Sequence, residues 1–84
     1  MTQRSKVKIY TADYCPYCSA AKRLLTSKGV SFEEIDVTDD DAMREKLIEM
    51  TGGRTTVPQV FVDGKSIGGY DDLSAFYSAG NRIV

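Results

Sequence analysis

The stretch Cys15-Pro16-Tyr17-Cys18 contains the only two cysteines of this 84-residue chain. It follows a run with the alternation of a strand and precedes a run with the pattern of a helix. Proline is favoured in the first turn of a helix, so we expect a helix to begin at Pro16. Cys15 then lies at the helix N-terminus, where unpaired N–H groups and the helix dipole favour the thiolate. Cys18 lies on the same helical face within reach of a disulfide, which suits reversible dithiol chemistry.

Three other interpretations of the cysteine pair compete with this one. A structural disulfide across so short a loop would constrain the unfolded chain very little. A zinc site needs four ligands, and the chain has no histidine, so carboxylates or a second chain would have to complete it. Two inert core cysteines would leave the Pro-Tyr spacer unexplained. We therefore expect a redox-active pair and no metal.

The composition is that of an ordinary globular domain, with 42% hydrophobic and 27% charged residues. Eighty-four residues are enough for one core, so a single domain over residues 1–84 is expected. With 11 basic and 12 acidic residues, and the basic ones scattered, we expect no nucleic-acid partner. Nothing resembles a signal peptide or a membrane span, so we expect no membrane partner and a cytoplasmic location. Neighbouring cysteines in that compartment are typically catalytic.

Periodicity predicts the order strand, helix, strand, helix, strand, strand, helix. The predicted elements cover residues 6–11, 16–28, 30–37, a second helix ending at Gly52-Gly53, 59–62, 65–68 and a last helix ending at Gly80. Thr38 or Asp39 is expected to cap the second helix, and Asp71 or Asp72 the last one. Asp63-Gly64 predicts a two-residue hairpin turn.

The core face of the second helix is expected to consist of Met43, Leu47 and Met50, which recur at helical spacing. The order of elements requires one right-handed parallel crossover followed by a hairpin.

Two further segments could contribute to a site near Cys15. Thr56-Val57-Pro58 could be a simple turn before the third strand. Alternatively, a cis Val57–Pro58 bond would turn the backbone of Val57 toward the thiolate, where an extended substrate could pair with it.

Gly68-Gly69-Tyr70-Asp71-Asp72 could be only a flexible strand exit and a helix cap. It could also bind a zwitterion, since glycines admit a ligand to the backbone and a helix N-terminus binds a carboxylate. An aspartate would then pair with the neighbouring ammonium. Arg54 and Tyr17 could hold a second carboxylate and the body of a small peptide.

Together, Cys-Pro-Tyr-Cys at 15–18, Thr-Val-Pro-Gln at 56–59 and Gly-Gly-Tyr-Asp-Asp at 68–72 resemble a dithiol glutaredoxin of the short bacterial type. The resemblance covers residues 6–79. It implies a thioredoxin-like α/β fold, with a four-stranded mixed sheet in the order 2-1-3-4 flanked by three helices. It also implies glutathione as cosubstrate, with no tightly bound cofactor.

The resemblance further implies roles for individual residues. Cys15 would be the nucleophile and Cys18 the resolving thiol. The implied glutathione contacts are Tyr17, Arg54, Thr56, Val57, cis Pro58, Gly69, Tyr70, Asp71 and Asp72. Many glutaredoxins have a lysine three residues before the nucleophile, where this chain has Ala12, and Arg54 could supply that cation.

The expected function is therefore a monomeric glutathione-dependent oxidoreductase that reduces protein disulfides and glutathione mixed disulfides. Such an enzyme transfers electrons and maintains cell redox homeostasis. One rival is a thioredoxin-like redoxin recycled by a flavoprotein reductase, which the Gly69–Asp72 segment disfavours. Another is a dimer that holds an iron–sulfur cluster between two Cys15 thiolates, which Pro16 disfavours.

Overall fold

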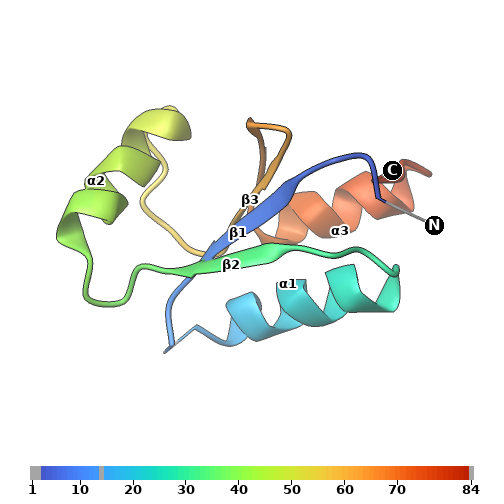
Figure 1. Ribbon diagram of the computed structural model, residues 1–84, viewed down its shortest axis with the longest axis horizontal. Helices are drawn as coiled ribbons and strands as arrows, with labels where there is room; N and C mark the ends of the chain where they lie inside the picture. The colour runs from blue at the N-terminus through green and yellow to red at the C-terminus, as the bar shows by residue number, and fades with distance from the viewer. Residues whose placement is uncertain (1–2, 14, 84) are drawn as a thin grey trace.

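The computed structural model describes residues 3–13 and 15–83, so the two ends of the predicted 1–84 domain lie outside the described part. Its elements are β1 (Val7–Thr11), α1 (Pro16–Ser27), β2 (Glu33–Asp36), α2 (Asp41–Met50), β3 (Gln59–Val62), β4 (Lys65–Gly68) and α3 (Tyr70–Ser78). The strands form one sheet in the order β2-β1-β3-β4 (Figure 1). The predicted thioredoxin-like arrangement is confirmed.

The central strand β1 sets the register of the sheet. It runs parallel to β2, with Lys8 opposite Glu33, and antiparallel to β3, with Ile9 opposite Val60. β3 and β4 are antiparallel and form the predicted hairpin. Its two turn residues, Asp63 and Gly64, have φ values of 52° and 81°. A type I′ turn requires positive φ at both positions, which an Asp-Gly pair tolerates.

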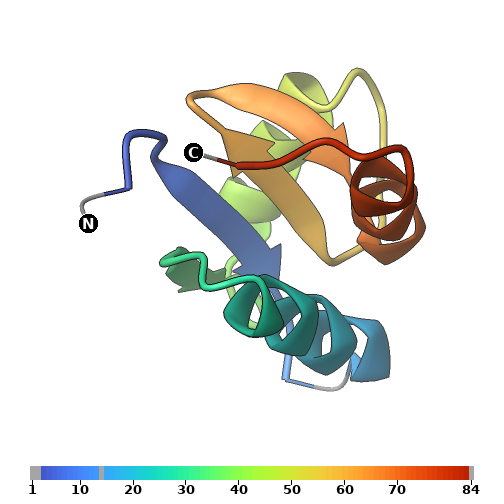
Figure 2. The same cartoon turned by 90° about the vertical axis from the view of Figure 1, so that its right-hand side faces the viewer.

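Helices cover both faces of the sheet. α1 and α3 lie side by side on one face and α2 lies on the other (Figures 1 and 2). Under α1 and α3, the core is built around side chains with no exposed surface, namely Ile9, Ala21, Leu25, Val60 and Leu73. Under α2, Leu47 packs on Tyr10 and Phe61, whose rings meet edge to face at 5.4 Å. Alternate residues of β1 therefore pack into the two different cores, one on each face of the sheet. Among the described residues, no helix is long and apolar enough to cross a membrane.

The second strand and helix differ from the sequence prediction at their ends. β2 has four residues instead of the predicted eight at 30–37. Asp40, rather than Thr38 or Asp39, caps α2, and its carboxylate accepts the N–H of Met43 at 3.0 Å. The Thr38 hydroxyl is engaged elsewhere, because it accepts the N–H of Asp13 at 3.0 Å and donates to Asp36 Oδ1. Met50 was predicted in the core, but 39% of its surface is exposed, because α2 ends there.

The last helix begins earlier than predicted. α3 starts at Tyr70, and its N-cap is Gly69 rather than Asp71 or Asp72. The carboxylate of Asp72 reaches back and accepts the N–H of Gly69 at 3.1 Å. This contact is one half of a capping box, in which an acidic side chain at the third helical position accepts the N–H of the N-cap residue, so Asp72 contributes to capping from inside the helix.

A polar contact joins β1, β2 and α1. Glu34 accepts hydrogen bonds from the Thr11 hydroxyl at 2.8 Å and the Lys22 ammonium at 3.0 Å. These two donors, Thr11 first, hold the pKa of Glu34 below its usual value. Because the pKa is lowered in the folded protein, ionised Glu34 stabilises the fold above about pH 4.3, the ordinary glutamate value. This stabilisation is lost as the pH falls further.

We therefore predict that Glu34→Gln lowers the free energy of unfolding by roughly 0.2–1 kcal/mol at pH 7, since the pair is partly exposed. At pH 3 the variant and the parent should be equally stable in urea unfolding. Glu33→Gln, on the opposite side of the same strand, removes the same charge as a control. An equal loss at both pH values would contradict the ionic role of Glu34.

Candidate active site

The two cysteines lie at the first turn of α1, beyond the end of β1. Cys15 is the N-cap residue, with extended backbone angles (φ −106°, ψ 108°), and Pro16 is the first helical residue, as predicted. The N–H of Cys15 donates to Ala12 O at 3.3 Å, and the N–H of Cys18 donates to Cys15 O at 3.2 Å. Both are free thiols. The pair is thus held by backbone contacts of the loop and the helix start.

The environments of the two sulfurs differ. Cys15 is half-exposed, whereas Cys18 is 2% exposed. Burial, supported by a hydrogen bond between the two thiols, raises the pKa of Cys18 to about 12. A thiol in that environment keeps its proton at neutral pH and is a poor nucleophile. Only Cys15, of these two, is placed to attack an incoming disulfide.

The loop before β3 borders the Cys15 sulfur. The Val57–Pro58 peptide bond is cis, as one of the two sequence interpretations predicted. The thiol of Cys15 donates to the carbonyl oxygen of Val57 at 3.4 Å. The backbone of this loop is therefore in direct polar contact with the Cys15 thiol.

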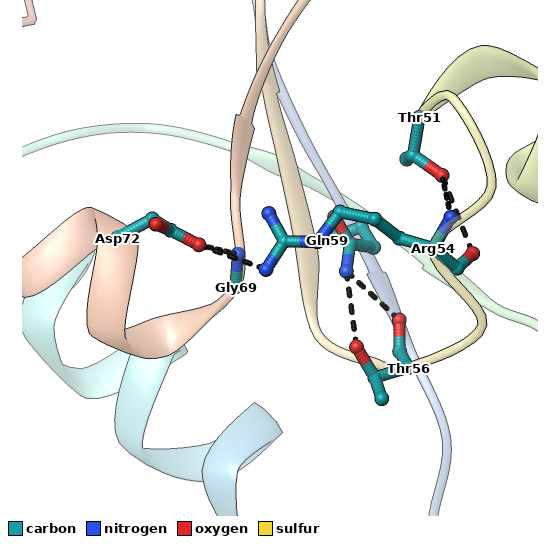
Figure 3. Close-up of polar contacts among 6 residues, drawn as sticks. All are labelled: Thr51, Arg54, Thr56, Gln59, Gly69 and Asp72. Carbon is teal, nitrogen blue, oxygen red and sulfur yellow. Dashed lines mark hydrogen bonds and ion pairs between the residues drawn. The ribbon is translucent and has the colours of Figure 1, made fainter.

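Gln59 anchors this loop, a role that sequence analysis missed. Its side chain is fully buried, and Nε2 donates to Thr56 O at 3.0 Å (Figure 3). The Thr51 hydroxyl accepts the N–H of Arg54 at 3.1 Å at the other end of the loop. An amide at the start of a central strand is expected to make buried hydrogen bonds, and that expectation could have directed attention to Gln59. Of its two polar atoms, only Nε2 has a partner among the described residues, and Oε1 is buried without one.

The structure brings the nine residues of the expected glutathione site together. They line one groove of about 270 Å³, between the first turns of α1 and α3 and the loop before β3. The lining residues are Tyr17, Arg54, Thr56, Val57, Pro58, Gly69, Tyr70, Asp71 and Asp72. Tyr17 is 61% exposed, and its ring centroid lies 6.1 Å from that of Tyr70. The groove thus combines aromatic surface, a helix N-terminus and charges of both signs.

Two of these residues form an ion pair that the sequence did not indicate. The Arg54 guanidinium donates to Asp72 Oδ2 at 3.0 Å (Figure 3). Arg54, and secondly the N–H of Gly69, hold the pKa of Asp72 below its usual value. The pair crosses over Gly68, which has a φ of 119°. A Cβ at Gly68 would collide with the Asp72 carboxylate and lie 2.6 Å from an Arg54 nitrogen.

Ala12, where many glutaredoxins have lysine, is 4% exposed and lies under the start of the cysteine loop. Arg54 reaches the groove from the loop that precedes β3. The groove therefore contains a cation, and Asp72 already holds that cation in place.

Comparisons with known proteins agree with this geometry. The glutaredoxin family model matches residues 7–67. Glutaredoxin 3 of Escherichia coli K12 is 53% identical over 76 residues, 90% of each chain. The crystal structure of a buckwheat glutaredoxin–glutathione complex has a TM-score of 0.83 and 32% identity, over 93% of this chain and 73% of that one. The solution structure of a glutaredoxin from Brucella melitensis has a TM-score of 0.78 and 44% identity, over 89% of this chain and 80% of that one.

Proposed function

The chain belongs to the glutaredoxin family, a family of glutathione-dependent thiol–disulfide oxidoreductases, and we propose how its own residues divide that reaction. Cys15 is the nucleophile and Cys18 the resolving thiol. The observation that carries this assignment is the contrast between the half-exposed Cys15 and the buried Cys18, whose pKa is raised to about 12.

With a glutathionylated protein, the Cys15 thiolate attacks the glutathione sulfur. The mixed disulfide breaks, the protein leaves as a thiolate that takes a proton from water, and glutathione is bonded to Cys15. A second glutathione thiolate attacks that bond, which releases oxidised glutathione and restores Cys15. This cycle uses two glutathione units and does not involve Cys18.

With a protein disulfide, Cys15 attacks one sulfur and the other leaves as a thiolate. Cys18 then loses its proton and attacks Cys15, which releases the reduced protein and leaves a Cys15–Cys18 disulfide. Two glutathione molecules reduce this bond and form one oxidised glutathione. The substrates are therefore disulfide-containing and glutathionylated proteins.

Glutathione binds in the groove between α1 and α3. The first N–H groups of α3 face the γ-glutamyl carboxylate, and Asp71 pairs with the adjacent ammonium. Tyr17 covers the body of the tripeptide, and Arg54 is near enough to the groove to attract the glycyl carboxylate. We place the enzyme in the cytoplasm as a monomeric single domain.

Reduction of the glutathione mixed disulfide of 2-mercaptoethanol tests this function. NADPH and glutathione reductase should support turnover only when glutathione is added. Turnover without glutathione, supported by NADPH and a flavoprotein thioredoxin reductase, would instead identify a thioredoxin-like redoxin.

Asp71→Asn should raise the KM for glutathione about two- to fivefold, which is the change expected when a partly exposed ion pair with the ligand is lost. Stability should change little, because Gly69 and Asp72, not Asp71, form the cap of α3. Reduction of the oxidised enzyme by dithiothreitol, which has no charged groups, should be preserved. Asp39→Asn, remote from the groove, is the control. Unchanged glutathione kinetics in Asp71→Asn would remove Asp71 from the site.

A further inference from the structure

The side chain of Gln59 acts on the loop beside Cys15 from inside the sheet. Gln59 is the first residue of β3, is 0% exposed and lies opposite Tyr10 of β1. Its backbone is thereby fixed in an interior strand, and its side-chain amide turns back by three residues. Nε2 donates to Thr56 O at 3.0 Å and to the Thr56 hydroxyl at 3.4 Å (Figure 3). A side chain anchored in the sheet therefore holds a carbonyl of the loop.

The carbonyl of Thr56 belongs to the same peptide unit as the N–H of Val57. This peptide bond is trans, since the one cis bond among the described residues is Val57–Pro58. In a trans peptide the C=O and the N–H point in opposite directions. Because the Thr56 C=O points to the buried amide, the N–H of Val57 is turned away from it. Gln59 thus fixes the direction of a donor that it does not touch.

The backbone of Val57 offers two polar groups next to the reactive sulfur. Its carbonyl oxygen accepts the Cys15 thiol at 3.4 Å. Its N–H has no acceptor among the described residues, and Pro58, which follows, has no N–H of its own. The N–H of Val57 is therefore a free donor on the residue that contacts the thiol, where a backbone carbonyl of an extended substrate can accept it.

We propose that Gln59 is a positioning residue of the exchange reaction. By holding the Thr56 carbonyl, it keeps the N–H of Val57 aimed at a backbone carbonyl of the substrate whose sulfur Cys15 attacks. This inference rests on the proposed function, because the substrate sulfur must reach Cys15. The contact needs only a peptide carbonyl, so glutathione and disulfide-bearing protein segments share it. Small dithiols without a peptide group do not use it.

Gln59→Met tests the proposal, because methionine has a similar length and volume but no donor. It also removes Oε1, which is buried without a partner among the described residues, so the loss of stability should be small. The Thr56–Val57 peptide is then free to rotate. The KM values for glutathione and for a disulfide-bonded peptide should both rise roughly two- to tenfold, as expected for one ordinary hydrogen bond. The kcat, and the reduction of the oxidised enzyme by dithiothreitol, should change little.

Thr11→Val is the matched control. Thr11 is also buried, at 1% exposure, and its hydroxyl donates to Glu34 at 2.8 Å. This substitution removes a buried hydrogen bond of the same sheet but leaves the loop before β3 untouched. It should lower stability without changing either KM.

Nuclear magnetic resonance gives a signature that a purely structural role would not produce. When glutathione is bonded to Cys15 in Cys18→Ser, the amide proton of Val57 should shift and exchange more slowly with solvent, because it becomes hydrogen-bonded. Adding Gln59→Met should reduce both changes. An unchanged Val57 amide in glutathionylated Cys18→Ser would overturn the proposal without any variant of Gln59, so the test stands even if Gln59→Met does not fold.

Two kinetic outcomes would also overturn the proposal. One is a Gln59→Met protein with both KM values unchanged. The other is a loss with dithiothreitol as large as the loss with glutathione, since Gln59 would then have only a structural role. In either case, wild-type turnover of the glutathione mixed disulfide of 2-mercaptoethanol leaves the proposed function standing. If the wild type cannot reduce that compound, the function itself fails.

Discussion

Cys15→Ser is expected to lose all thiol–disulfide exchange, whereas Cys18→Ser is expected to keep the reduction of glutathione mixed disulfides. A serine hydroxyl cannot replace a thiolate at neutral pH. Cys15 is the half-exposed sulfur at the start of α1, and Cys18, which is buried and protonated, cannot substitute for it. Reduction of protein disulfides should be lost in both variants, because that route needs the Cys15–Cys18 bond.

The measurement pairs each variant with two substrates, a glutathione mixed disulfide and a peptide with an internal disulfide. Mass spectrometry of Cys18→Ser should also detect glutathione bonded to Cys15. Thermal unfolding of both reduced variants should resemble that of the reduced parent, since serine and cysteine are similar in size. An equal loss of activity toward the glutathione mixed disulfide in both variants would reject the assigned roles.

Gly68→Ala is expected to have the largest effect among substitutions outside the cysteines. The φ of 119° is strained for any residue with a Cβ, at a cost of about 1–3 kcal/mol. For a domain of this size each kcal/mol lowers the Tm by roughly 4–8 °C. The new methyl group would also displace both Arg54 and Asp72, and would separate Asp72 from the N–H of Gly69. The KM for glutathione should rise about tenfold, the equivalent of one charge-assisted hydrogen bond.

Gly80→Ala separates the cost of backbone strain from the displacement of Arg54 and Asp72. Gly80 also has positive φ, at 87°, but no atom lies within 4 Å of the added Cβ. It should therefore lower stability while leaving the KM for glutathione unchanged. If the two alanine variants have the same KM, the ion pair over Gly68 does not support the glutathione groove.

Sequence periodicity predicted the order and number of elements because each has a clear apolar face or a specific turn. Asp63-Gly64 is an example, since few sequences other than Asp-Gly fit its backbone. Helix caps were harder to assign. Three consecutive aspartates stand at the start of α2, two before it and one as its first residue. Asp40 is the cap in a turn where the Thr38 hydroxyl already contacts Asp13 and Asp36. The periodicity of apolar residues in the sequence does not predict tertiary contacts of that kind.

The resemblance to a known family identified the residues that line the proposed glutathione groove, but not how they contact one another. The ion pair between Arg54 and Asp72 joins residues 18 positions apart, and only the fold brings them together. Gln59 was quoted as part of a motif without a role, because its partner is a backbone carbonyl that no sequence pattern reveals.

The raised pKa of Cys18 also bears on the second step of the two-cysteine route. Burial is the largest cause of the raised pKa, and it persists through the reaction. The hydrogen bond with Cys15 and the charge of Cys15 also raise the pKa of Cys18, but both disappear once the Cys15 sulfur enters a disulfide. Cys18 therefore becomes more acidic only after the first exchange has occurred. Because burial still delays its deprotonation, free glutathione has time to intercept the mixed disulfide. The partition between the one-cysteine and two-cysteine routes should thus follow glutathione concentration, with abundant glutathione favouring the first.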